Sequence, residues 1–314
     1  MKAHCWPMVR SRIKSSAQRH VTKLSEKLCK TVMSPTKVRT GAAQVGLMLS
    51  ALVVALSYGL PAKSQTVIPA GHLLIQIESD TGEDRDVARV VAFGGTCMSC
   101  ELSGKRLSGA NFVGANFTGA SLIGADLRRA NMKGSSFRNC DFTKVDLRDA
   151  VMSGSNFYSA NFASARLSDI SANGANFSKA NLRKARLSDA SLAASNLSGA
   201  LLEDADLRDA ILASANLNQI NGRRADFRDA ILLNASLNGA DLSGANFAGA
   251  NLRGARMNGA ILRGARLSDA DLDLADLRGA DMTHVRGLEQ NQLNRACGDA
   301  ATRLPSGLRI RTCR

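Results

Sequence analysis

The two cysteines of the segment Cys97-Met-Ser-Cys100 are the residues of this chain with the clearest potential for chemistry. A Cys-x-x-Cys pair can form a redox-active disulfide, supply half of a zinc site or close a structural disulfide. Zinc requires four ligands, and neither a second such pair nor a histidine cluster lies near, since His72 and His284 are isolated. We therefore expect a disulfide, and a thiol-dependent enzyme is the least favoured function.

Three further cysteines follow the first pair. Cys297 and Cys313 lie close to the C-terminus, and the elongated rod inferred below separates them from the first pair. A disulfide requires Cα atoms within about 7 Å, so the only feasible bridges are Cys97 with Cys100 and Cys297 with Cys313. Cys140 occupies an inward position for small side chains and should be a buried free thiol.

Other catalytic constellations are not apparent in the sequence. It has no nucleophile with a matching histidine, no phosphate-binding glycine loop and no metal-ligand cluster. We therefore predict no catalytic residue, no cofactor and no metal, and expect that the protein is not an enzyme.

The net charge of +14 is concentrated at the start of the chain. Residues 1–40 contain ten basic residues and one acidic residue, whereas residues 101–285 contain 22 basic and 19 acidic residues. A nucleic-acid interface gathers Lys and Arg on one face with few acids among them. The near-neutral balance of residues 101–285 argues against nucleic acid as a partner.

Residues 101–285 repeat every five positions without an insertion. An apolar residue recurs at every fifth position from Leu102 to Met282, and a small residue, usually Ala, lies two positions before it. Helices require apolar spacings of three and four and plain strands a spacing of two, so this period predicts short extended runs separated by turns. At the two weak central positions, Ala172 and Gly222, an isoleucine replaces the small residue two positions earlier.

Pentapeptides such as Ala240-Asp-Leu-Ser-Gly244 and Ala250-Asn-Leu-Arg-Gly254 follow the pattern Ala-(Asp/Asn)-Leu-x-x. This pattern resembles the consensus of the pentapeptide-repeat family. The resemblance implies an all-β fold, a right-handed quadrilateral parallel β-helix in which four pentapeptides form one coil. It also implies that the central residue and the preceding Ala face inward, and that the protein is a scaffold.

Residues twenty positions apart should then stack in columns. One predicted column is a buried aromatic ladder of Phe117, Phe137, Phe157 and Phe177. Because the interior of such a rod is close-packed, we interpret this ladder as core and not as a cofactor site.

A second predicted column is acidic and exposed. Its members are Asp149, Asp169, Asp189, Asp209, Asp229 and Asp269. Family members that inhibit DNA gyrase are thought to mimic DNA phosphates, so a DNA-mimicking gyrase-binding protein is the alternative function if the chain stays in the cytoplasm. Arginines such as Arg148 and Arg208 lie beside this column, which favours a near-neutral, solvated face.

Apolar residues replace the usual Asp, Asn or Ser at several outward positions. Their side chains could form an exposed strip for a protein partner or for self-association. The candidate residues are Val151, Ile211, Ile231, Leu233 and Leu274. Neither the partner nor the oligomeric state can be read from them.

An uncharged apolar stretch at 41–60 follows Lys37 and Arg39 and precedes the small residues Ala62 and Ser64. This order is typical of a secretory signal that is cleaved before Gln65. The basic head is longer than an ordinary signal, and translation from Met33 would explain the excess. The alternative is an uncleaved segment that anchors the protein in the inner membrane and is its only contact with a membrane.

These segments define the predicted organisation. Residues 1–64 are the basic head with a signal or anchor, residues 65–100 an irregular N-terminal cap, residues 101–285 the β-helix and residues 286–314 a C-terminal cap. Leu288 to Gly298 should form a short helix in that last cap. The favoured function is an exported, non-catalytic, protein-binding scaffold of the periplasm or cell surface, or a secreted one.

Overall fold

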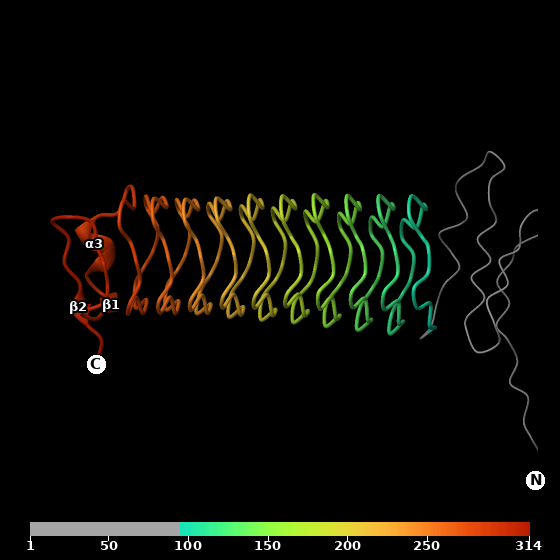
Figure 1. Ribbon diagram of the computed structural model, residues 1–314, viewed down its shortest axis with the longest axis horizontal. Coiled ribbons are helices and arrows are strands. Elements are labelled where there is room, and N and C mark those ends of the chain that lie inside the picture. The colour runs from blue at the N-terminus through green and yellow to red at the C-terminus, as the bar shows by residue number, and fades with distance from the viewer. Residues whose placement is uncertain (1–94) are drawn as a thin grey trace, which may run out of the picture. The chain divides into compact units, whose positions relative to one another are not determined.

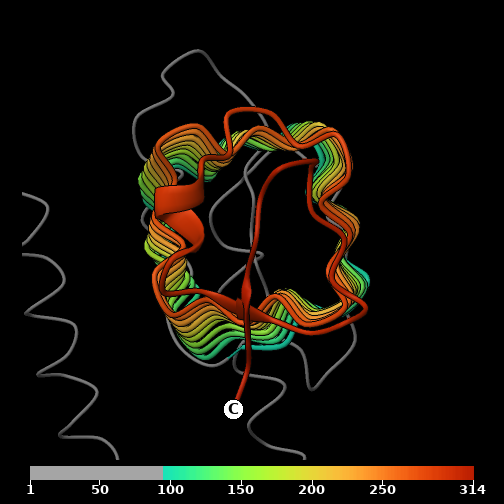
Figure 2. The same ribbon diagram turned by 90° about the vertical axis from the view of Figure 1, so that its left-hand side faces the viewer.

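The computed structural model describes residues 95–314, in which the chain forms a right-handed parallel β-helix (Figure 1). The coils stack along the long axis and superimpose when viewed along that axis (Figure 2). Each coil continues directly into the next. This confirms the right-handed β-helix that the resemblance to the pentapeptide-repeat family implies.

Backbone pairing gives the register of the coils. The first residue of each pentapeptide forms a parallel bridge with the residue twenty positions later, from Thr96 with Asn116 to Arg266 with Arg286. The bonds repeat with little variation, and the Phe137 amide, for example, donates to the Asn156 carbonyl oxygen at 2.7 Å. Side chains twenty residues apart therefore stack, and one coil contains four pentapeptides.

The extended run of each pentapeptide is short because a turn follows its second residue. The fourth residue has a positive φ from coil to coil, for example 59° at Asp189 and 70° at Gly249. Among residues other than Gly, Asp and Asn tolerate this left-handed conformation best. The predicted acidic column therefore lies at a turn position where backbone geometry favours Asp.

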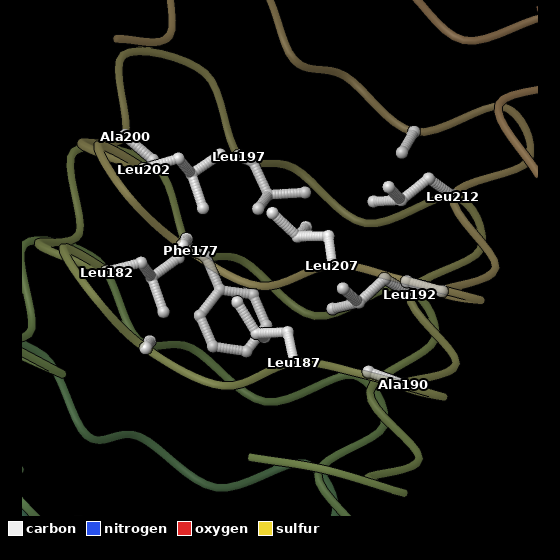
Figure 3. Close-up of a cluster of buried hydrophobic side chains, with 14 of the residues drawn as sticks. Phe177, Leu182, Leu187, Ala190, Leu192, Leu197, Ala200, Leu202, Leu207 and Leu212 are labelled. Atoms are coloured by element: carbon white, nitrogen blue, oxygen red, sulfur yellow. The ribbon is translucent and has the colours of Figure 1, made fainter. Parts of the chain in front are cut away.

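Central side chains of successive coils fill the interior. The rings of Phe117 and Phe137 stack with centroids 5.0 Å apart, those of Phe137 and Phe157 are 5.7 Å apart, and those of Phe157 and Phe177 are 5.0 Å apart. All four side chains are buried, which confirms the predicted aromatic ladder. Further along, leucines such as Leu197 take over this inward position (Figure 3).

The two weak central positions are filled as predicted. A Cβ atom added to Gly222 would lie 3.0 Å from Leu242 Cδ2 and 3.4 Å from Ile220 Cδ1, so little space is left there. Ile170 and Ala172 are likewise buried. Because a cavity the size of a leucine side chain costs about 2–5 kcal/mol, the compensating isoleucine is expected.

The regular register extends one pentapeptide further toward the N-terminus than the sequence predicts. Thr96 already pairs with Asn116, and Cys97 occupies the buried central position of that pentapeptide. The predicted signal or anchor at 41–60 and residues 65–94 of the predicted cap lie outside the described residues. Within residues 95–314, no helix is long and apolar enough to cross a membrane.

The chain leaves the regular coils after Arg286. It forms helix α3 (Gln290–Leu293), strand β1 (Cys297–Gly298) and strand β2 (Arg311–Thr312), and the two strands are parallel. The prediction of a helix that ends at Gly298 was wrong. The Cys297 amide donates to the Ala275 carbonyl oxygen at 3.0 Å, so the chain re-enters the backbone ladder at that point.

Candidate binding surface

Stacking sorts the outward side chains into four columns, each made of pentapeptides whose first residues are twenty positions apart. We name each column by its character and by the first residues of its first and last pentapeptides. These are the amide column (Thr96 to Asp276), the mixed column (Glu101 to Asp281), the charge-paired column (Arg106 to Arg266) and the apolar column (Asn111 to Asp271).

The predicted partner residues all lie in the apolar column. Ile211 and Ile231 form a parallel bridge, and 40% and 39% of their surfaces remain exposed. Val151 and Leu274 are also exposed, and Leu233 is partly buried. Side chains that are up to 123 positions apart in the sequence therefore line one side of the coils.

This column also lacks charge over its middle part. Its five pentapeptides that begin at positions 151 to 231 contain no Asp, Glu, Lys or Arg, and Lys133 and Arg253 are the nearest charges along the column. The mixed and charge-paired columns, by contrast, carry many charged side chains. An uncharged strip with exposed aliphatic side chains is a surface from which a partner can displace water at low cost.

Sequence reasoning missed other exposed apolar residues. Val113 lies in the apolar column with 38% exposure, and Ile261 lies in the mixed column with 38% exposure. Ile261 occupies the first position of its pentapeptide, as Ile211 does. A search of every first position for aliphatic residues would have found it.

The charge-paired column carries nine arginines and ten aspartates, and its ion pairs form mostly within a pentapeptide. Arg148 contacts Asp146 at 2.7 Å, and Arg208 contacts Asp206 at 2.7 Å. The hydrogen bond that each arginine donates to its aspartate is the main cause of the raised pKa of that arginine. The Asp206 carboxyl has a lowered pKa, chiefly because of the hydrogen bond from Arg208.

The acidic turn column lies beside these pairs. Asp149 and Asp209 also raise the pKa of the adjacent Arg148 and Arg208, and Asp149 lies 3.9 Å from Arg129. A shallow cleft lined by Ser108, Arg128, Arg129, Arg148 and Asp149 therefore contains charges of both signs, with arginine in excess. Asp149, Asp169, Asp189, Asp209 and Asp229 do recur at one turn of five successive coils, but each of their pentapeptides also carries an arginine, so the column as a whole is nearly neutral.

The structure brings the predicted cysteine pairs together. The Cα atoms are 5.5 Å apart in Cys97–Cys100 and 4.8 Å apart in Cys297–Cys313, and each pair is joined by a disulfide. Cys140 is free and buried, as predicted. Burial raises the pKa of its thiol to about 12, so the thiol stays protonated and unreactive near neutral pH.

Asp276 lies close to Cys297 and Cys313, and atoms of these three residues fall within 4.8 Å of one another. Thiolates bind metals, but these two sulfur atoms are bonded to each other. The Asp276 carboxylate binds Arg278 at 2.6 Å. The proximity of these three residues is therefore explained by a disulfide that lies next to an ion pair.

Three family models match the chain, and together they span residues 97–286. A model of the pentapeptide repeat region matches 140–217, and a nine-copy model of pentapeptide repeats matches 117–160. An eight-copy model of pentapeptide repeats matches 97–134, 205–244, 223–259 and 250–286. No curated protein matches the chain.

Several solved structures are similar to the chain. HetL, a pentapeptide repeat protein involved in heterocyst differentiation regulation from the cyanobacterium Nostoc sp. strain PCC 7120, is 27% identical. The alignment covers 66% of this chain and 90% of HetL, with a TM-score of 0.34. Full-length QnrB1, a plasmid-mediated fluoroquinolone resistance protein, is 20% identical over 66% of this chain and 94% of its own, with a TM-score of 0.35. A pentapeptide repeat protein from the Arabidopsis thaliana thylakoid lumen is 30% identical over 35% and 70%, with a TM-score of 0.17.

Proposed function

Because the chain belongs to the pentapeptide-repeat family, we propose that it is an exported, non-catalytic scaffold that binds a protein partner through its apolar column. The observation that carries this proposal is the placement of the exposed aliphatic residues. Val151, Ile211, Ile231, Leu233 and Leu274 share one column. Its middle five pentapeptides are free of charge.

The geometry of this strip suits a protein. Ile211 and Ile231 are adjacent, so a partner can cover both with one apolar side chain. Isolated surface aliphatics are common, whereas aligned ones without nearby charge are characteristic of interfaces. The partner is either a different protein or a second copy of this chain, and the experiment below distinguishes them by mass.

Export is supported by two independent features. The order of basic, apolar and small residues around 41–60 is that of a secretory signal, and cleavage before Gln65 would release the coils. Disulfides persist in oxidising compartments, and four cysteines of the described range form two of them. The periplasm and the cell surface both fit, as does secretion. Retention by an uncleaved 41–60 segment is the alternative.

We also infer a four-sided coil with one pentapeptide on each side, because a coil contains four turns of similar geometry. The segments at both ends then act as caps. At the C-terminal end, Leu293 and Ala296 are buried, and the Gln292 side chain donates to the carbonyl oxygens of Leu267 and Ala270. An end covered in this way does not leave a backbone edge open.

DNA mimicry is the weaker candidate. It would require a row of acids with few cations among them, whereas the charge-paired column has almost equal numbers of both. The acidic turn column follows from positive φ values, such as 59° at Asp209, which Asp tolerates. Turn geometry thus accounts for the column without a nucleic-acid-like role.

The decisive experiment is photocrosslinking in the producing cell. A photoreactive residue at Ile211 or Ile231 should form one discrete adduct, whereas the same residue at Ile261 should not, although Ile261 is equally exposed in the mixed column. The mass of the adduct identifies either a second copy or a different protein. Identical patterns at Ile211 and Ile261, or no adduct at Ile211, would reject the apolar column as the interface.

Export is tested separately by cell fractionation and mass spectrometry of the mature N-terminus. A protein that begins at Gln65 in the periplasm or the medium is the expected result. An intact N-terminus in the membrane fraction would indicate anchoring, and a cytoplasmic protein would overturn export.

A further inference from the structure

The amide column differs from the other three in its chemistry. Its nine pentapeptides from Thr96 to Ala260 contain no acidic residue, and most of their outward side chains are Asn, Ser, Thr or Gln. Asn196 and Asn216 use their side-chain oxygens to accept the amide N–H groups of Ser198 and Asn218. Their side-chain NH₂ groups have no partner among the described residues, so these donors are available to a ligand.

One group of side chains interrupts this neutral surface. Arg138, Tyr158 and Lys179 come from three successive coils, with the tyrosine ring in the middle coil. The Arg138 guanidinium carbon lies 5.3 Å from the ring centroid, and the Lys179 ammonium nitrogen lies 5.7 Å from it. Both cations are exposed, and each contacts the same aromatic ring from a neighbouring coil, one on either side of the coil that carries Tyr158.

These two cations lack the usual neutralising partners. Arginines of the other columns bind carboxylates, for example Arg183 with Glu203 and Arg224 with Asp204. Within residues 95–314, neither Arg138 nor Lys179 forms an ion pair with a carboxylate.

The acid that follows Arg138 most closely in the sequence is Asp141, and it is already engaged. Its Oδ1 atom accepts hydrogen bonds from the Thr143 amide at 2.9 Å and from the Asn161 side chain at 3.2 Å. The hydrogen bond from Lys179, together with the nearby Arg138, lowers the pKa of the Tyr158 phenol. Positive potential is therefore concentrated at this place, and Arg256 is the one other charged residue of these nine pentapeptides.

We propose that the amide column binds an acidic glycan, whose sugar carboxylates are held by Arg138 and Lys179 from the coils on either side of the Tyr158 hydroxyl. Charge-assisted hydrogen bonds from two cations and a phenol suit carboxylates. The Asn and Ser side chains of the following coils supply hydrogen bonds to sugar hydroxyls. This site lies on a different column from the proposed protein interface and does not depend on it.

The test is isothermal titration calorimetry of the purified protein with tetragalacturonate, using cellotetraose as the uncharged glycan and tripolyphosphate as the non-glycan anion. Lys179→Gln and Arg138→Gln should each weaken tetragalacturonate binding about tenfold, the effect of losing one charge-assisted hydrogen bond. The matched control is Lys184→Gln, because Lys184 is exposed at the same turn position of the next pentapeptide, with φ of 56° against 58° at Lys179. This control should bind as the wild type does.

Tyr158→Phe distinguishes the role of the hydroxyl from that of the ring, since it keeps the ring contacts with both cations and removes only the hydroxyl. It should weaken binding less than Tyr158→Ala, which also releases the cations. Failure to bind tetragalacturonate, equal binding of cellotetraose, tighter binding of tripolyphosphate or an equal loss in Lys184→Gln would each overturn the acidic-glycan site. Circular dichroism of every variant checks that these exposed substitutions leave the fold intact.

Discussion

Ile211 and Ile231 lie side by side in a parallel bridge, at positions where the repeat usually carries Asp, Asn or Ser. Each isoleucine leaves about two fifths of its surface in water, 40% and 39% respectively. In two successive coils, this position therefore carries an isoleucine in place of the usual polar residue, although the side chain is not part of the core. Such a departure is more consistent with a role in binding than with a role in stability.

The double variant Ile211→Asn/Ile231→Asn should therefore fold as the wild type does. Surface substitutions that restore the residue type of the repeat change the free energy of unfolding by only about 0.5 kcal/mol. Urea unfolding measures this directly, and crosslinking from an unchanged neighbouring position should lose the partner adduct. A large drop in stability would mean that the isoleucines belong to the packing of the coils.

Phe157→Ala should destabilise the coils strongly. The ring is buried between Phe137 and Phe177, and removal of a buried aromatic side chain costs about 3–5 kcal/mol. Chemical denaturation should reveal this loss, whereas Tyr158→Ala, next to it on the outside, should cost much less. Similar losses for the two variants would contradict the inward orientation of the ladder.

Replacement of Asp189 tests the origin of the acidic column. With φ at 59°, Asp189→Gly should be tolerated, whereas Asp189→Val should cost about 1–2 kcal/mol because a β-branched residue is strained in the left-handed region. Thermal unfolding of both variants provides the comparison. If Gly and Val were equally tolerated, the turn would not explain why Asp recurs there.

Asp281 should make the free energy of unfolding depend on pH at low pH. Its burial raises the carboxyl pKa, but hydrogen bonds from Arg263 and Thr283 outweigh burial and lower the pKa from 3.8 to about 2. A lowered folded-state pKa means that the stabilisation is present above pH 3.8 and is lost as the pH falls through about 2. The stability advantage of wild type over Asp281→Asn should therefore shrink by about 2 kcal/mol between pH 5 and pH 2. Unfolding curves across this range would show no such convergence if the carboxylate were unpaired.

The Cys297–Cys313 disulfide should stabilise the C-terminal segment locally. It closes a sequence separation of 16 residues, and a loop of this length contributes about 3 kcal/mol in the chain-entropy model. The variant Cys297→Ser/Cys313→Ser should increase hydrogen exchange of the backbone amide of residue 313, which in the wild type donates to the Gly298 carbonyl oxygen at 2.9 Å. Exchange at the Phe157 amide, deep in the coils, should stay unchanged. Faster exchange at both places would indicate that the bridge supports the whole β-helix.

Much of the fold could be predicted from the sequence because the repeat leaves few alternatives. The period marks each central residue from Leu102 to Met282, the family resemblance assigns these residues to the interior, and the filling of the Gly222 position by Ile220 follows from volume. The C-terminal segment could not be predicted in the same way. Cys297 resumes the backbone ladder through contacts with residues twenty positions and more away, and local helix signals carry no information about them.

The candidate surfaces were predicted unevenly for a related reason. Ile211 and Ile231 stand out because each breaks the repeat at its own position. Arg138 and Lys179 are ordinary residues at their positions, and their significance arises from a shared ring and from the absence of acids in nine successive pentapeptides of one column. Only after every outward residue is sorted by its column does this pattern become visible.

The uninterrupted twenty-residue register makes the β-helix a molecular ruler. Each coil advances by about 4.8 Å, so the spacing between two sites in one column is set by how many coils separate them. Loss of twenty residues would shorten that spacing by one step and leave every downstream side chain in its column. Loss of five residues would instead turn everything downstream by a quarter of a coil and split the strip that joins Val151 to Ile211. Insertions or deletions of twenty residues, or of a multiple of twenty, therefore preserve the surface columns, whereas other lengths disrupt them. This rule constrains the evolution of the chain and guides its engineering.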